Sequence, residues 1–570
     1  MRSVPSGIPP GPLGEPLRSG YSLAMRRVSL VLAMLACALA PAGLAAPVKV
    51  YGHAILPGPL PGTRALQALD AYPKTLVGLD PARAGAAVPA LLRAGSQEIA
   101  APLALWRLPS RRAQRLLPSL TRLGLVRSVT PDVPLRPDAV FDQYTDPLVP
   151  YEWWIPDIGA NQVEPPGPGV PITVIDTGLD MSHEEFAGRP NTSAGNTQNI
   201  SGGQEEFHGT AVASVAAAPT NGVGVVGVYP QAVLRAWDAS PNGQLTVGDE
   251  VQGLVWAFTH GRSVINLSLG GTDYVPIEED AILAAFGAGS LVVVAAGNDR
   301  QKGSPREYPA SFAHVLTVAS TDQNDNVSSF SNRSKFMDLA APGESIPAAI
   351  PTSFLASGYS AVDGTSFASP LVAGAAADVW TKRPTLKNTQ LFDLMRSSAR
   401  YVGRRGWTPD TGFGILNLPA ATSGTAPAVD PQEPNEDIYL VRPNGLFRAG
   451  HAPLTAPDHG RASLSARLDS SEDPEDVYRI WVPKRSRMTI ALKPTANVNL
   501  ELWGPKTRTV FEKGGVLKRD LVAASAHPGK ALERVRIRNS GPGVHAYVDA
   551  YLGKNVRSAT YALAITTARR

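Results

Sequence analysis

Ser366 is the residue whose surroundings in the chain most clearly indicate chemistry. It follows Gly364-Thr365 and opens a run of small apolar residues that continues to Val379. Surface helices alternate polar and apolar faces, so a helix that is apolar nearly all round is predicted to be buried. Its first turn would hold the Ser366 Oγ rigidly beside unpaired backbone N–H groups and the positive end of the helix dipole. Such a position suits a nucleophile and can stabilise an oxyanion.

Three other polar residues stand at the ends of apolar segments. Asp176 ends the run Ile172–Ile175, and Asn298 closes the run that begins at Val293. His208 opens a second helix of small apolar residues. Functional groups of α/β sheets gather at the carboxyl ends of strands. Each of these residues alone could be a turn or core residue, but two buried helices that begin with a catalytic residue type are rarely accidental.

Together the four residues predict acyl transfer by a serine nucleophile. His208 would take the Ser366 proton during attack on a carbonyl, and Asp176 would hold the imidazole in the required tautomer. The side-chain amide of Asn298 and the backbone N–H of Ser366 would donate to the oxyanion. The order Asp, His, Ser along the chain differs from the orders in chymotrypsin and the α/β-hydrolases.

The elements that must position these residues form an α/β pattern from Ile172 to about Ala421. Continuous apolar strands alternate with Ala- and Gly-rich helices, which implies a parallel sheet with helices on both faces. The strands are expected at Ile172–Ile175, Val264–Leu267, Leu291–Ala295 and Val315–Val318.

Five motifs surround these residues: Val174-Ile-Asp176-Thr-Gly, His208-Gly-Thr, Asn266-Leu-Ser268-Leu-Gly270, Ala295-Ala-Gly-Asn298 and Gly364-Thr-Ser366-Phe-Ala-Ser-Pro370. By these motifs the chain, over about residues 137–422, resembles the subtilisin-like serine proteases (subtilases, peptidase family S8). The resemblance implies their α/β fold and a serine endopeptidase with the triad Asp176, His208 and Ser366, whose chemistry requires no cofactor.

The resemblance also implies which residues contact the substrate. An alignment with the family places Glu307 near the floor of the pocket for the P1 side chain, where its charge would favour Lys or Arg. A solvated loop glutamate is the alternative interpretation of Glu307. The walls that bind the substrate strand would be formed by Ser268, Leu269, Gly270, Ala296 and Gly297.

The resemblance also leads us to expect structural calcium, although no ligand spacing assigns a site. The candidate calcium ligands are Asp180, Glu184, Glu185 and the Asp/Asn residues of 322–326.

The chain departs from the family pattern at three packing positions, Val212, Ser214 and Phe367, of which Phe367 replaces the usual methionine after the nucleophile.

Three other classes of protein have to be weighed. A second Asp-Thr-Gly at Asp410 suggests an aspartic protease, but Trp407-Thr-Pro before it is not a strand. A lipase or esterase would carry Gly-x-Ser-x-Gly, whereas Ser366 follows Gly-Thr. A pseudoprotease or surface-binding protein is disfavoured by the intact set of Asp176, His208, Asn298 and Ser366.

The N-terminal region 1–46 has the pattern of a secretory signal. The basic Met25-Arg-Arg precedes the apolar run Val28–Leu39, and small residues follow, with Met25 as a candidate true start. The run is shorter than the roughly 20 residues of a transmembrane helix. The only cysteine, Cys37, lies in this run in a poor match to the lipoprotein pattern, so a lipid anchor is disfavoured. We expect a secreted or cell-surface protein without a transmembrane span after signal removal.

Residues 47–136 are predicted to form a small α+β domain. Strands are expected at Lys49–Leu56 and Glu98–Leu108, and leucines at helical spacing predict a helix at Arg111–Leu123. The resemblance implies that this domain is a propeptide that inhibits the enzyme and assists its folding. Processing would then fall between Arg136 and Tyr144.

The part after the catalytic domain is predicted to be a separate antiparallel β-sandwich. A Pro-rich linker at 423–437 precedes residues 438–570, in which short alternating strands are separated by Gly and Pro turns. The net charge of +4 over 570 residues gives no ground for a nucleic-acid partner. Protein or peptide substrates, the chain's own propeptide as intramolecular inhibitor and a monomeric state are expected.

Overall fold

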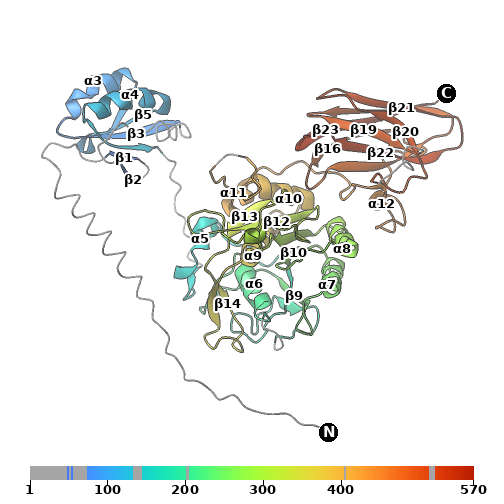
Figure 1. Ribbon diagram of the computed structural model, residues 1–570, viewed down its shortest axis with the longest axis horizontal. Coiled ribbons are helices and arrows are strands. Elements are labelled where there is room, and N and C mark those ends of the chain that lie inside the picture. The colour runs from blue at the N-terminus through green and yellow to red at the C-terminus, as the bar shows by residue number, and fades with distance from the viewer. Residues whose placement is uncertain are drawn as a thin grey trace, which may run out of the picture. The chain divides into compact units, whose positions relative to one another are not determined.

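The computed structural model describes residues 48–50, 53–55, 73–132, 144–200, 205–403, 406–511 and 520–569. The chain divides into two compact units between Pro137 and Asp138 (Figure 1). The predicted signal region, with Cys37, lies outside the described residues. In the described part of the chain, no helix is both long and apolar enough to cross a membrane.

The first unit contains a six-stranded sheet in the order β2-β1-β6-β3-β5-β4. The predicted helix is α4 (Ser110–Arg122), whose Leu117 and Leu120 are buried. The expected strand at 49–56 is two short antiparallel strands, and the one at 98–108 is divided by a 3₁₀ turn. The other elements are β1 (Val48–Val50), β2 (His53–Ile55), β3 (Lys74–Leu79), α3 (Val88–Arg93), β4 (Gln97–Ala100), β5 (Leu105–Pro109) and β6 (Val126–Pro131).

A seven-stranded sheet forms the centre of the second unit, in the order β13-β12-β11-β10-β7-β9-β8. All its neighbouring strands are parallel, which confirms the predicted α/β fold. The strands are β7 (Ile172–Asp176), β8 (Thr192–Ala194), β9 (Leu234–Asp238), β10 (Val264–Leu267), β11 (Leu291–Ala295), β12 (Val315–Thr321) and β13 (Leu339–Pro342).

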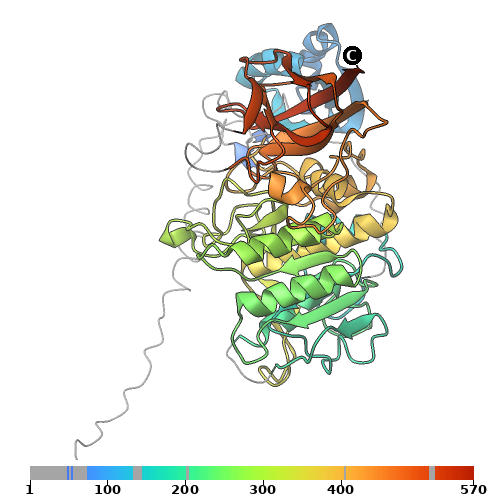
Figure 2. The ribbon, with the colours of Figure 1, turned by 90° about the vertical axis from the view of Figure 1, so that its right-hand side faces the viewer.

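Helices cover both faces of this sheet because its strands are apolar on both sides. On β11, Val293 points into one core, and Val292 and Val294 point into the other. Helices α6 (His208–Ala217) and α9 (Thr365–Lys382) belong to the first core. Helices α7 (Val247–Thr259) and α8 (Pro276–Gly287) cover the opposite face, as Figure 2 shows.

The prediction that the helix of Ser366 is buried is confirmed. Every residue of α9 from Phe367 to Trp380 is buried, so the helix runs through the core. A two-stranded sheet of β14 (Ile346–Ala349) and β15 (Tyr359–Val362) precedes it. The remaining helices of this body are α5 (Trp154–Asp157), α10 (Asn388–Ser397) and α11 (Leu418–Ser423).

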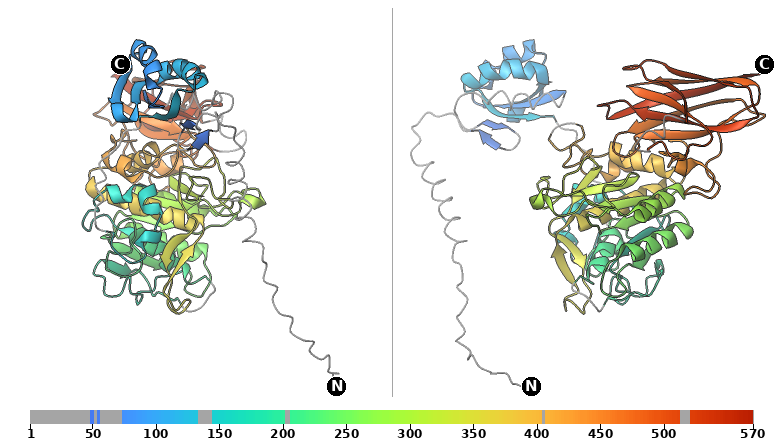
Figure 3. Two further views of the ribbon diagram at one scale, coloured as in Figure 1. Left: turned by 90° about the vertical axis from the view of Figure 1, so that its left-hand side faces the viewer. Right: turned by 45° about the vertical axis from the view of Figure 1, so that its right-hand side comes forward.

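The C-terminal part is the predicted antiparallel β-sandwich (Figure 3). Its two four-stranded sheets have the orders β16-β23-β18-β21 and β17-β22-β19-β20. Alternate residues of both sheets form one apolar core, which includes Ile490, Leu500 and Leu563. The elements are α12 (Ile438–Val441), β16 (Arg461–Asp469), β17 (Glu475–Val482), β18 (Ser486–Pro494), β19 (Val498–Trp503), β20 (Leu521–Ser525), β21 (Glu533–Asn539), β22 (Val544–Leu552) and β23 (Ser558–Arg569).

Candidate active site

The four residues that the sequence singles out lie at one edge of the parallel sheet. Asp176 is the last residue of β7, and Asn298 follows the end of β11. His208 is the first residue of α6, and Ser366 is the second residue of α9. A cavity of about 640 Å³ is lined by His208, Asn298 and Ser366, so the fold brings them to a common space.

The imidazole of His208 is held by Asp176. Its Nδ1 lies 2.8 Å from Asp176 Oδ1, which also accepts a hydrogen bond from the backbone N–H of Thr177 at 2.8 Å. Asp176 is buried, and its Oδ2 accepts no hydrogen bond. Burial lowers the pKa of His208, but the Asp176 carboxylate, with a smaller contribution from Glu205, more than offsets this, and the pKa lies above the ordinary 6.5. The pair is therefore arranged to stabilise an imidazolium.

The hydroxyl of Ser366 is turned toward the backbone rather than toward the imidazole. Its Oγ donates to the carbonyl oxygen of Ser268 at 3.4 Å, and the Ser268 Oγ donates to the Ser366 carbonyl at 2.8 Å. Without substrate, catalytic hydrogen bonds are often long or poorly aligned.

Thr365 orients the side chain of Asn298. The Oδ1 of Asn298 accepts hydrogen bonds from the Thr365 backbone N–H at 3.0 Å and from its hydroxyl at 2.9 Å. The oxygen is thus fixed on α9, and the amide NH₂ is left as the donor for an oxyanion. The sequence analysis did not assign Thr365 a role, although its place directly before the nucleophile could have suggested one.

A second cavity, of about 300 Å³, adjoins Ser366 and Asn298. Among the predicted substrate-binding residues, Ala296 does not line this cavity; it is buried, and its carbonyl accepts a hydrogen bond from Asn332 at 3.1 Å. The neighbouring Ala295 lines the cavity instead. The predicted residues that do line it are Ser268, Leu269, Gly270, Gly297 and Glu307.

Glu307 lies against Gly297 in this cavity. A Cβ at Gly297 would lie 2.2 Å from Glu307 Oε2, so only glycine leaves room for the carboxylate. Asn332 donates to Glu307 Oε1 at 2.7 Å and fixes its direction. Burial raises the pKa of Glu307 above its ordinary value. Asn332 was not predicted, because it is distant from Glu307 in sequence.

A third cavity, of about 250 Å³, continues the same wall and is also acidic. It shares Leu269 and Gly270 with the second cavity and is lined in addition by Glu250 and Glu278. Burial raises the pKa of both glutamates, and that of Glu278 to about 7. This pair was not predicted from the sequence. The pattern that could have indicated it is a glutamate at a buried position of each helix, Glu250 in α7 and Glu278 in α8.

The departures from the family pattern are packing positions in the structure. The Phe367 ring lies against His208, with ring centroids 5.5 Å apart. Val212 is buried, and the hydroxyl of Ser214 donates to the Ala211 carbonyl at 2.7 Å and accepts from Ala349 N–H at 2.9 Å. The buried hydroxyl that replaces a glycine hydrogen is thus fully paired.

The second Asp-Thr-Gly does not join the site. Asp410 forms an ion pair with Arg300 at 2.6 Å. A Cβ at Gly412, which has a φ of 55°, would lie 2.1 Å from the Asp338 carbonyl oxygen, so this glycine serves a tight turn. Asp410 lines neither of the two cavities beside Ser366, so the two motifs do not form the carboxylate pair of an aspartic protease.

The predicted calcium ligands are engaged in protein hydrogen bonds. Asp180 accepts from Ser182, Glu184 from the Tyr359 hydroxyl and Glu185 from the Val225 N–H. Asp322 accepts from the backbone of its own turn. The two groups of possible metal ligands in the described part of the chain lie elsewhere and contain none of these residues.

Comparison with known proteins assigns the chain to a family. The model of the "Subtilase family" of peptidase S8 matches residues 167–414. Subtilisin BL of Lederbergia lenta is 37% identical over 266 residues, which are 45% of this chain and 91% of that protein. Subtilisin DY of Bacillus licheniformis is 36% identical over 281 residues, which are 48% of this chain and 98% of that protein. The chain therefore belongs to the subtilase family and is a subtilisin-like serine endopeptidase.

A solved structure is similar to a larger part of the chain. Fervidolysin from Fervidobacterium pennivorans, described as a keratinolytic enzyme related to subtilisin, covers 81% of this chain, and the chain covers 84% of it. The TM-score is 0.46 at 20% sequence identity.

The contact between Thr365 and Asn298 predicts a coupled effect on catalysis. Thr365→Val removes one of the two hydrogen bonds that orient Asn298 and should lower kcat about tenfold, the equivalent of about 1.4 kcal/mol. If Thr365 acts through Asn298, adding Thr365→Val to Asn298→Ala should change kcat less than twofold. Steady-state kinetics of the two single variants and the double variant measure this coupling. Independent, fully additive losses would contradict the positioning role.

Proposed function

We propose that this chain is a secreted serine endopeptidase, made as a zymogen, that cleaves peptide bonds through Asp176, His208 and Ser366. The observation that carries the proposal is the 2.8 Å contact between His208 and Asp176 at a cavity that Ser366 also lines. This arrangement provides a base, the group that orients it and a nucleophile, which are the three roles that acyl transfer by serine requires.

The proposed reaction has two halves. In the first, the Ser366 Oγ attacks the carbonyl carbon while His208 accepts its proton, and the imidazolium then protonates the leaving amine. In the second, His208 deprotonates a water molecule that attacks the acyl-enzyme and returns the proton to Ser366. In both halves the amide of Asn298 and the Ser366 backbone N–H stabilise the oxyanion.

We assign recognition of the P1 side chain to the cavity that contains Glu307. An extended substrate would lie along Ser268–Gly270 as an added strand, and its P1 side chain would enter this cavity. The carboxylate of Glu307, held by Asn332, would pair with Lys or Arg there. The partial burial of Glu307 supports this role, because a partly desolvated charge interacts more strongly than a solvated one.

The zymogen model assigns a role to each part of the chain. Residues 1–46 would direct secretion, and 47–136 would form an inhibitory propeptide. The catalytic domain would be 137–422, followed by a linker at 423–437 and the β-sandwich at 438–570. The proposal is supported by the division of the chain near residue 137 and by a separate apolar core before it. Calcium would serve stability and not the reaction itself.

Removing the nucleophile tests the proposal. Ser366→Ala should lower kcat on casein about 10⁶-fold, the loss known for subtilisin. Asn298→Ala should cost about 10²–10³-fold, again as in subtilisin. Casein hydrolysis measures both, and mass spectrometry of the secreted Ser366→Ala protein should find the propeptide uncleaved. Activity of Ser366→Ala close to that of the parent would contradict the mechanism.

The raised pKa of His208 predicts the pH dependence. His208 must be neutral to accept the serine proton, so kcat/KM should fall as the pH decreases through a midpoint above 6.5. Asp176→Asn removes the carboxylate that raises the pKa, so it should move the midpoint down and lower kcat/KM about 10⁴-fold. The exposed Glu164→Gln is the control and should leave the profile unchanged. A midpoint that does not move in Asp176→Asn would refute the assignment.

Glu307 predicts a preference for basic P1 residues that depends on pH. Peptides with Arg at P1 should be cleaved at least tenfold faster, in kcat/KM, than matched peptides with Phe. Because burial raises the pKa of Glu307, this ratio should increase as the pH rises through that pKa and the carboxylate ionises. Glu307→Gln should abolish the preference without slowing cleavage after Phe, whereas Glu164→Gln should retain it. Equal cleavage after Phe and Arg by the parent enzyme would disprove this specificity.

A further inference from the structure

A group of carboxylates is buried where the linker meets the β-sandwich. Asp430, Glu433 and Glu436 come from the linker, Asp473 lies just before β17, and Asp476 is the second residue of β17. The side chain of Glu433 is 3% exposed, and residues Asp473 and Asp476 are 5% and 0% exposed. Carboxylates are almost never this deeply buried unless they are paired or bind a metal.

The hydrogen bonds of this group leave several oxygens without a donor. Asp476 Oδ2 accepts from the Tyr561 hydroxyl at 2.5 Å, and Glu433 Oε1 accepts from Asn435 at 2.7 Å. The other oxygens of these two residues, Asp476 Oδ1 and Glu433 Oε2, are buried and accept no hydrogen bond, and the same holds for Asp473 Oδ1.

The cations nearby do not balance this charge. His314 Nε2 forms a close ion pair with Glu436 and lies 3.6 Å from Glu433 Oε2. Arg467 donates its backbone N–H to Asp430, but its guanidinium pairs with Asp393. The Arg467 guanidinium also attracts Asp430 and Asp473. Five carboxylates therefore face one imidazole and one guanidinium that Asp393 shares, and like charges this close in a dry region repel strongly.

We propose that Asp430, Glu433 and Asp476 bind a calcium ion at this junction. One oxygen from each residue lies within 4.8 Å of the other two, a separation that fits ligands on opposite sides of an ion with bonds of about 2.3–2.6 Å. Glu433 Oε2 and Asp476 Oδ1 accept no hydrogen bond, whereas the two oxygens of Asp430 share the backbone N–H of Arg467 at 3.3 and 3.2 Å. Asp473 adds negative charge beside them.

The donor set and its spacing favour calcium over other divalent ions. All three ligands offer oxygen, which a hard cation prefers. Magnesium demands a near-ideal octahedron with bonds of about 2.0–2.1 Å, whereas calcium accepts longer bonds in a flexible geometry, which suits oxygens that lie within 4.8 Å of one another. Zinc would favour the neighbouring group of His314, Glu433 and Glu436, because it includes a nitrogen ligand. In that group, however, the ring nitrogen of His314 forms an ion pair with Glu436.

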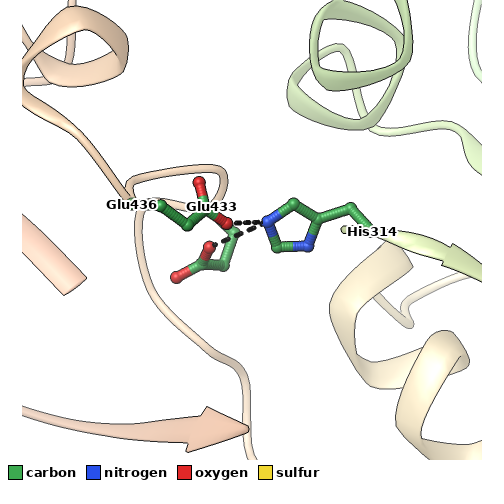
Figure 4. Close-up of side chains that lie close together, drawn as sticks. All are labelled: His314, Glu433 and Glu436. Atoms are coloured by element: carbon green, nitrogen blue, oxygen red, sulfur yellow. Dashed lines mark hydrogen bonds and ion pairs between the residues drawn. The ribbon is translucent and has the colours of Figure 1, made fainter. Parts of the chain in front are cut away.

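The site joins the β-sandwich to the α/β body. Figure 4 shows that His314, from the α/β body, faces Glu433 and Glu436 of the linker. The His314 ring stacks on Phe286 of α8, with centroids 4.4 Å apart, and its backbone N–H donates to Glu472 at 3.1 Å. An ion bound by Asp430, Glu433 and Asp476 would hold the linker and the start of β17 together beside His314. Calcium should therefore fix the docking of the two domains.

Calcium binding by the full chain with Ser366→Ala, which cannot digest itself, tests the proposal. After chelation, calorimetric titration with calcium should show one site fewer when Asp476→Asn is added. Glu501→Gln changes a half-buried carboxylate of the same sandwich outside the group and should keep every site. An unchanged number of calcium sites in Asp476→Asn would overturn the proposal. So would binding of zinc, but not calcium, that His314→Ala abolishes.

Thermal unfolding separates a calcium ligand from a merely structural carboxylate. Without calcium, Asp476→Asn removes repulsion and should unfold at a temperature equal to or above that of its Ser366→Ala parent. With calcium in excess the order should reverse, because only the parent gains the binding energy. Calcium should also slow the cutting of linker 423–437 by an added protease in the parent but not in the variant. A variant that is less stable by the same amount in both buffers would overturn the assignment, and Asp430→Asn offers the same test independently.

Discussion

The site depends on how closely the first turn of α6 approaches the turn after β7. A Cβ at Gly209 would lie 2.2 Å from the Gly178 carbonyl oxygen, so the residue after His208 must be glycine. The Gly209 N–H donates to the Thr177 hydroxyl at 2.9 Å, which fixes helix and turn together. Because of this approach the imidazole of His208 reaches the carboxylate of Asp176. A small residue beside the histidine is thus a geometric requirement of the proposed chemistry.

Much of the fold and of the site could be predicted because the signals are local. The buried helix of Ser366 and the parallel sheet follow from continuous apolar runs, and the four proposed catalytic residues stand at the ends of such runs. Strands β16, β20 and β21 were not predicted, because small residues such as alanine and serine or alternating arginines leave few large apolar residues in them.

The contacts between distant segments could not be predicted from one sequence. Asn332 holds Glu307, and Glu250 lies in one cavity with Glu278, although each pair is well separated along the chain. The junction carboxylates show the same limit. None of them was predicted from the sequence to be a calcium ligand, since nothing local brings the linker, the start of β17 and His314 together.

Ser366 is proposed to be a nucleophile activated by His208, and covalent labelling tests this role most directly. An organophosphorus fluoride reacts with activated serines, and the labelled peptide can be located by mass spectrometry. We predict one label per chain, on Ser366, and its loss in His208→Ala. An unlabelled Ser366 in protein that still cleaves casein, or a label that persists in His208→Ala, would contradict the claim.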